Sequence, residues 1–131
     1  MNNESIDAIH KAIDWLNKNK RSNNIVKFVK VVDELTIQLS YVSTLVSEAY
    51  EGMNDAEDDY KIAIAKFMTE FEGSAAKGEK AAEVEYADLK RAWTGYKNLY
   101  KRLNTFMERT DKICDSHKQR VSVMKNIDLK I

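Results

Sequence analysis

The chain has 131 residues, with no proline, four glycines and one cysteine, and its 21 basic and 21 acidic side chains give a net charge of zero. A chain of this length forms one domain at most, and so few turn-forming residues disfavour a sheet protein, so we expect a single all-α domain over residues 1–131. The lone cysteine excludes an internal disulfide bond, and zero net charge gives no overall argument for binding nucleic acid.

The first expected helix covers residues 5–17. Ser5 is suited to cap it, with Asp7 in the first turn. A short apolar stripe follows it, made of Ile6, Ile9, Ile13 and Leu16. The segment 17–24 contains no apolar residue, which predicts a loop.

The second expected helix covers residues 24–72 and carries the strongest pattern in the chain. Thirteen of its fourteen heptad seam positions are apolar, and only Glu70 breaks the series: Ile25, Phe28, Val32, Leu35, Leu39, Val42, Val46, Ala49, Met53, Ala56, Tyr60, Ala63 and Phe67. This alternation predicts coiled-coil-like packing of one stripe against a partner helix. Gly52 lies inside the helix, where a glycine costs about 1 kcal/mol against alanine, so a break near Gly52 stays open.

The segment Gly73–Gly78 predicts the main interruption, because glycine commonly ends a helix. A third helix is expected over 79–126. Its apolar stripe, from Ala82 to Met124, has a second row beside it: Ala92, Leu99, Phe106, Ile113 and Ile127. Two rows make the apolar face wider than one partner requires. The extra face would contact the first helix, in its own chain or another, or a second subunit.

A short turn between two long helices makes them antiparallel neighbours. We therefore expect a long antiparallel helical hairpin with a short N-terminal helix. Residue 51 should then lie near residue 100. A thin hairpin has a poor surface-to-volume ratio, which favours an oligomer.

Charge is segregated along the chain. Residues 31–60 contain eight acidic residues and no basic one, whereas residues 90–130 contain eleven basic and four acidic residues. In a hairpin, the acidic residues from Glu48 to Asp59 would face bases from Lys90 to Arg102. Such complementary pairing would set the register rather than bind a ligand.

Other basic residues have no such match. One group lies within 18–30 and 118–130, and another consists of Lys61, Lys66, Lys77 and Lys80. Either group could follow a phosphate backbone, with Trp15, Phe28 or Phe67 available for stacking. A solvated helix face is the alternative explanation for each group.

No residue pattern indicates catalysis or a cofactor. Cys114 and His117 lie one helical turn apart, but two ligands are too few for a structural zinc site, and both fall on the expected packing seam. The cluster from Asp55 to Asp59 lacks the glycine and alternating oxygen ligands of a calcium loop. There is no glycine-rich phosphate loop. We expect a protein that is not an enzyme and holds no metal.

Location follows from the same composition. No stretch approaches the ~18 apolar residues that a membrane span needs, and no basic segment followed by an apolar run suggests export. One cysteine suits a reducing compartment. We expect a cytoplasmic protein with no membrane contact.

The end of the third expected helix contains Asp115, Lys118, Arg120 and a closing Met124-Lys125 pair. Before it come a heptad-patterned helix, a break with glycine and serine, and an acid-rich restart. Over roughly residues 60–127 this layout resembles the UvsY family of phage recombination mediators. The tripeptide Trp93-Thr94-Gly95 is also similar to the WxG turn of small secreted hairpin proteins, but here it falls in mid-helix rather than at a bend.

The UvsY resemblance implies a ring-like oligomer that binds single-stranded DNA without sequence preference. It also implies two protein partners, a recombinase and the single-strand-binding protein that the recombinase replaces. DNA contacts in the family come from basic residues before the break. The nearest matches are Lys61 and Lys66, with Lys77 and Lys80 beyond it, although this sequence has spaced lysines rather than a tight basic pair.

The family's C-terminal helix carries oligomerisation. Packing and subunit contacts would then fall on Leu99, Leu103, Phe106, Met107, Ile113, Val121 and Met124. The alternative function is a helical protein–protein module, such as a phage-encoded adaptor, an inhibitor of a host factor or a scaffold. It would use the acidic face from Glu48 to Asp59 and would not bind DNA.

Overall fold

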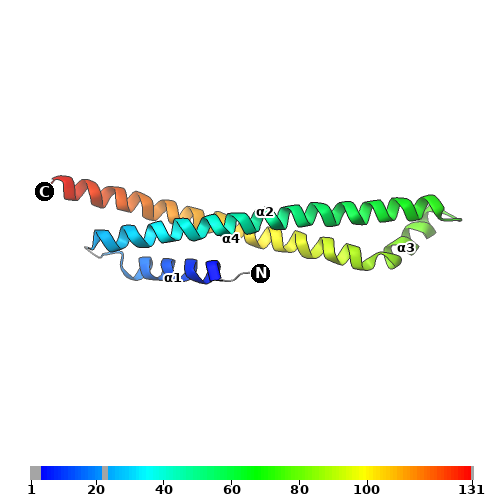
Figure 1. The fold of residues 1–131 in the computed structure, drawn as a ribbon, viewed down its shortest axis with the longest axis horizontal. Coiled ribbons are helices and arrows are strands. Elements are labelled where there is room, and N and C mark those ends of the chain that lie inside the picture. Colours follow the sequence, from blue (N-terminus) through cyan, green and yellow to red (C-terminus); the bar gives the residue numbers. More distant parts are fainter. Residues whose placement is uncertain (1–3, 22–23, 131) are drawn as a thin grey trace. The chain divides into compact units, whose positions relative to one another are not determined.

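A computed structural model describes residues 4–21 and 24–130, with side chains as far as 126. Over these residues the protein is all-helical and contains no strand. The helices, coloured from blue to red in Figure 1, are α1 (Glu4–Lys18), α2 (Ile25–Glu70), α3 (Ala75–Glu85) and α4 (Ala87–Lys130). None of these described helices is long and apolar enough to cross a membrane.

The chain divides into two compact units. Unit 1 combines Met1–Leu45 with Leu103–Ile131, and unit 2 is Val46–Arg102. Helices α2 and α4 contribute to both, whereas α1 belongs to unit 1 and α3 to unit 2.

Unit 1 packs three helical segments around a continuous core. The largest fully buried side chains among the described residues all belong to it: Ile9, Leu16, Phe28, Leu35, Val42, Thr110 and Cys114. Within each segment they recur at intervals of four or seven residues, as one face of a helix requires. Three segments enclose side chains completely, which explains why this unit holds the bulky core.

Helix α1 packs within its own chain. The His10 ring lies edge-on to Phe106 of α4, with 5.5 Å between centroids, and Trp15 lies 6.2 Å from Phe28 of α2. Part of the second apolar row on α4 is therefore covered by α1. The side chain of Ile127 lies outside the described residues.

Unit 2 is built from the second part of α2, α3 and the first part of α4. Its buried hydrophobic residues are small: Val46, Ala49, Ala56 and Ala82. Aromatic side chains fill the space between α2 and α4. The ring centroids of Tyr50 and Tyr100 lie 5.3 Å apart, and those of Tyr60 and Trp93 lie 5.9 Å apart. The partner's number falls along α4 as it rises along α2, so the two segments are antiparallel inside this unit.

The heptad seam of α2 is confirmed by burial. None of its thirteen apolar residues is exposed, whereas Glu70 is. The helix runs through Gly52 without interruption, so the break left open at that position is absent.

The structure corrects the expected single helix over 79–126. The break near Gly73 is present, and Gly73 has a φ of 136°, which suits glycine. The next helix, however, begins at Ala75, because the Ser74 side chain accepts a hydrogen bond of 3.3 Å from the Lys77 N–H. The chain is interrupted again at Tyr86.

Tyr86 leaves the helical conformation, with φ −108° and ψ 27°. Its N–H still donates to the Ala82 carbonyl at 2.9 Å, and its own carbonyl accepts from the Lys90 N–H at 3.2 Å. Its ring lies edge-on to Phe67 at 6.1 Å. The interruption thus places an aromatic side chain against Phe67 of α2, while the N–H and carbonyl of Tyr86 stay hydrogen-bonded.

Trp93-Thr94-Gly95 lies inside α4, and no bend separates the helix there. A Cβ at Gly95 would meet nothing within 4 Å, so this glycine permits no close helix approach. The bend that would have supported the WxG reading is absent.

Candidate nucleic-acid interface

The four lysines predicted to contact DNA all lie in unit 2 and are all exposed. Lys61 is engaged within its own helix, since its Nζ lies 2.6 Å from Oε1 of Glu57. The hydrogen bond and charge of Glu57 raise the pKa of Lys61 above its usual 10.5. Its positive charge is therefore partly neutralised by a neighbour four residues away.

Lys66, Lys77 and Lys80 form no ion pair with any described residue. Lys66 is on α2, and the other two are on α3, after the turn at 71–74. An ammonium group without a local counterion is free to contact a phosphate.

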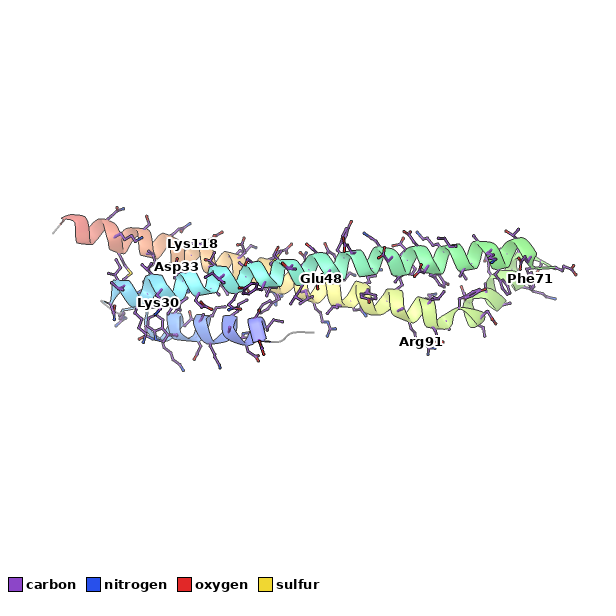
Figure 2. The ribbon with its side chains drawn as sticks, viewed as in Figure 1. Lys30, Asp33, Glu48, Phe71, Arg91 and Lys118 are labelled. Carbon is purple, nitrogen blue, oxygen red and sulfur yellow. The ribbon has the colours of Figure 1, made fainter. Side chains whose placement is uncertain are left out.

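Close packing holds α3 against the end of α2. Gly78 is buried, and a Cβ added there would lie 2.8 Å from Phe71 and 3.0 Å from Met68. Phe71, labelled in Figure 2, stacks on Phe67 with 5.7 Å between centroids. We call Lys66, Lys77 and Lys80 the turn lysines. In the sequence, Lys66 precedes this aromatic pair on α2, and the other two follow it on α3, after the turn.

The residues predicted for the oligomer interface differ in accessibility. Leu103 and Val121 are buried inside unit 1, and Ile113 is exposed. The remaining four are half-buried: Leu99, Phe106, Met107 and Met124. Internal packing thus occupies two of the seven, and subunit contact by the others stays a prediction.

A cluster of aromatic and basic side chains lies in unit 1. The Phe28 ring is 5.9 Å from the His117 ring, and the Arg120 guanidinium carbon is 5.1 Å from the Phe28 centroid. Lys27 Nζ lies 5.3 Å from the Trp15 centroid. Burial lowers the pKa of His117 below its usual 6.5, and the positive charges of Arg120 and Lys20 lower it further.

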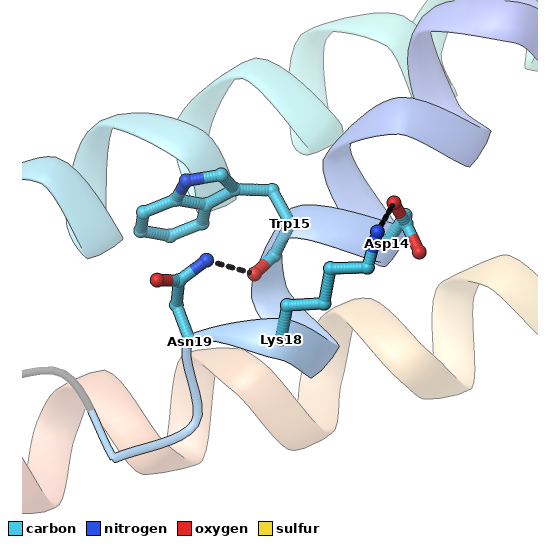
Figure 3. Close-up of polar contacts among 4 residues, drawn as sticks. All are labelled: Asp14, Trp15, Lys18 and Asn19. Atoms are coloured by element: carbon cyan, nitrogen blue, oxygen red, sulfur yellow. Dashed lines mark hydrogen bonds and ion pairs between the residues drawn. The ribbon is translucent and has the colours of Figure 1, made fainter.

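The end of α1 fixes the backbone at Trp15. Asn19 donates two hydrogen bonds to the Trp15 carbonyl, from its side-chain amide at 2.8 Å and its backbone N–H at 3.0 Å. Lys18 pairs with Asp14 at 2.9 Å in the same turn (Figure 3). The two Asn19 hydrogen bonds satisfy the Trp15 carbonyl at the end of the helix.

Sequence reasoning missed a groove between α1 and α2, whose volume is about 710 Å³. Its lining comprises Ala8, Lys11, Ala12, Trp15, Asn24, Val26, Lys27, Lys30, Val31 and Glu34. The available signal was the pair of alanines one turn apart on α1, which leave space beside α2. We call this feature the α1–α2 groove.

The expected pairing between acids and bases across the two long helices is wrong. Among the described residues, no acidic residue from Glu48 to Asp59 pairs with a basic residue of α4. The observed ion pairs of Lys18, Lys61 and Arg91 each join residues of one helix. Aromatic side chains pack between α2 and α4 in unit 2, and all of these acidic residues except the half-buried Glu57 are exposed.

Cys114 and His117 are both buried in the packing seam, as expected for structural residues. Cys114 Sγ lies 3.5 Å from Oγ1 of Thr36, a hydrogen bond between α4 and α2. Within the described part of the chain, no group of three or more His, Cys, Asp or Glu side chains could hold a metal ion.

Comparison with known proteins adds no assignment. No protein-family model matches the sequence, and neither the curated proteins nor the solved structures contain a match to this chain.

Proposed function

We propose that this chain is a non-enzymatic accessory protein that binds single-stranded DNA in the cytoplasm and acts as an oligomer of antiparallel, coiled-coil-like hairpins. The observation that carries the proposal is the set of turn lysines, which are exposed, form no ion pair with any described residue, and lie before and after the stacked Phe67–Phe71 pair in the sequence. The UvsY-like layout of the sequence adds the biological role. In that role the oligomer presents a strand to a phage-type recombinase and displaces the single-strand-binding protein.

Binding of this kind needs no sequence readout. Lysines contact phosphates as point charges, and aromatic side chains accept any base by stacking. Each phosphate contact on a single strand contributes about 0.7 to the slope of log affinity against log salt, so the three turn lysines predict a slope of about −2 per subunit. An oligomer multiplies such weak sites along one strand.

The test is fluorescence anisotropy with labelled single-stranded oligonucleotides of several sequences at low salt. We expect binding that is independent of sequence and weakens as salt rises. The variant Lys66→Glu/Lys77→Glu/Lys80→Glu should lose roughly tenfold or more in affinity. The matched control, Lys90→Glu/Lys97→Glu/Lys101→Glu, changes the charge of unit 2 by the same amount at exposed positions. It should bind single-stranded DNA substantially more tightly than the turn-lysine variant does. Absence of binding by the wild-type protein would refute the proposal.

The second candidate is a protein–protein module that uses the acidic face of α2. The observation in its favour is that acidic residues from Glu48 to Asp59 form no ion pair with a basic residue in the described part of α4. An adaptor, an inhibitor of a host factor or a scaffold would present such a surface. Asp55→Lys/Asp58→Lys/Asp59→Lys should then abolish capture of the partner while leaving nucleic-acid behaviour unchanged.

A further inference from the structure

The α1–α2 groove has an apolar floor and a basic lining. Ala8, Ala12 and Val31 contribute short apolar side chains, and Trp15 contributes a half-buried ring. Val26 is 76% exposed, although it is aliphatic and lies beside the groove. A groove of this kind between two helices is shaped to receive the side of another helix.

Charge defines the occupant further. Lys11, Lys27 and Lys30 are exposed in the lining and form no ion pair with the described residues. The single acidic group, Glu34, accepts a hydrogen bond of 2.8 Å from Gln38. The occupant should therefore present carboxylates beside an apolar surface.

The same chain carries a helix face with that chemistry. On α2 in unit 2, acidic residues recur at intervals of three or four: Glu48, Glu51, Asp55 and Asp58. Ile62 continues this row and is 66% exposed. We call Glu48, Glu51, Asp55, Asp58 and Ile62 the acidic stripe. All five are exposed, and the four acids form no ion pair with any described residue, although the charge of Asp58 contributes to the raised pKa of Lys61.

We infer that the acidic stripe of one copy docks into the α1–α2 groove of a second copy. The stripe adds a fourth helix to the three of unit 1, with its carboxylates near Lys11, Lys27 and Lys30. Groove and stripe are different surfaces, so the contact is head-to-tail and repeats into a ring or a filament rather than closing as a two-fold dimer. This inference rests on the oligomeric state within the proposed function and names the surfaces that produce it.

Charge reversal tests the contact. The groove variant is Lys11→Glu/Lys27→Glu/Lys30→Glu, and the stripe variant is Glu51→Lys/Asp55→Lys/Asp58→Lys. Each alone should be monomeric by light scattering at a concentration where the wild type assembles. An equimolar mixture should recover the wild-type mass, because each altered surface then meets one of opposite charge. Assembly should also weaken with salt.

Two further variants keep the test independent of folding. Val26→Asp places a carboxylate at an exposed groove position and should repel the stripe, so it should also reduce the mass. Lys90→Glu/Lys97→Glu/Lys101→Glu should assemble as the wild type does. Circular dichroism confirms that each variant is helical.

The outcomes separate this inference from the proposed function. Full assembly of both charge-reversal variants, or failure of their mixture to assemble, would overturn the groove contact while leaving the oligomer itself intact. A monomeric wild type at every concentration would refute both the contact and the oligomeric state. Anisotropy with single-stranded DNA reports binding separately in each case.

Discussion

Gly52 of α2 lies directly against the ring of Tyr96 on α4, where a Cβ at position 52 would come within 2.5 Å of the tyrosine Cε1. Such a contact is shorter than packed carbon atoms allow. The ring therefore occupies space that exists only because residue 52 has no side chain. The close packing offsets the conformational cost of a glycine inside a helix, which is about 1 kcal/mol.

Replacing Gly52 should show how the packing of Tyr96 offsets the cost of a glycine inside the helix. Gly52→Ala should stabilise a Tyr96→Ala background by about 1 kcal/mol, the usual gain in helix propensity. In the wild-type background the gain should be absent or reversed, because the ring must move. Urea unfolding followed by circular dichroism gives both values. Gly95→Ala is the matched control, since nothing lies within 4 Å of its Cβ position, and it should stabilise both backgrounds alike.

Ser74 should determine where α3 begins. Its side chain accepts a hydrogen bond from the Lys77 N–H, and loss of such a cap costs about 1 kcal/mol. Ser74→Ala should increase amide hydrogen exchange over 75–85, whereas Ser74→Asp should preserve protection. Ser116→Ala, at an exposed position inside α4, serves as the control and should leave α3 unchanged. Equal protection in Ser74→Ala would contradict the cap.

Phe28 should be the residue on which unit 1 depends most. It is fully buried and contacts the rings of Trp15 and His117. Phe28→Ala should cost about 3–5 kcal/mol, as for other buried phenylalanines. Phe71→Ala, at a half-buried position in unit 2, should cost less. Urea unfolding measures both, and a similar cost for the two would contradict the difference between the unit cores.

Burial along α2 was predictable because a period of 3.5 residues leaves one face to pack. Position in the sequence alone could then identify Phe28, Leu35 and Val42 as core. The second apolar row on α4 likewise indicated another neighbour, and α1 provides it at Phe106. In each case a local pattern determined the outcome.

The α2–α3 turn was harder to predict from the sequence, because glycine can either end a helix or allow close packing inside one. Gly78 suggested the end of a break, whereas it lies inside α3 and allows Phe71 and Met68 to approach. The interruption at Tyr86 has no glycine or proline nearby, and the Tyr86 ring there contacts Phe67, which is distant in sequence. The α1–α2 groove depends on the register of α1 across a loop. Contacts between segments, rather than local preference, decide all three.

The stability of unit 1 should depend on pH through His117. Burial, with Arg120 and Lys20, lowers the pKa of His117 below 6.5 in the folded protein. The unfolded chain binds the proton more readily. The contribution of His117 to the free energy of unfolding is therefore fully present above about pH 6.5 and decreases as the pH falls towards the folded pKa. Below the folded pKa both states are protonated and the loss ends.

His117→Gln should remove this contribution. The urea midpoint of the variant should fall less than that of the wild type between about pH 7 and pH 5. Carboxylates titrate in both proteins, so their effect cancels when the urea midpoint of the variant is compared with that of the wild type. Parallel curves for the wild type and His117→Gln would show that the imidazole is protonated equally in both states.

The pair between Lys61 and Glu57 should restrain DNA binding. Lys61 Nζ lies 2.6 Å from the Glu57 carboxylate, so a phosphate must compete with that partner. Glu57→Gln keeps the shape of the side chain and removes its charge. The freed ammonium should add one phosphate contact, which raises the affinity for single-stranded DNA and steepens the salt slope by about 0.7.

Asp14→Asn is the matched control for that variant. It breaks a pair of the same spacing, between Asp14 and Lys18 of unit 1, and removes the same charge from the chain. If net charge alone governed binding, both variants would gain affinity equally. A gain confined to Glu57→Gln would identify Lys61 as a phosphate contact. An unchanged slope in Glu57→Gln would remove Lys61 from the site, because a lysine that contacts DNA must respond when its competitor is neutralised.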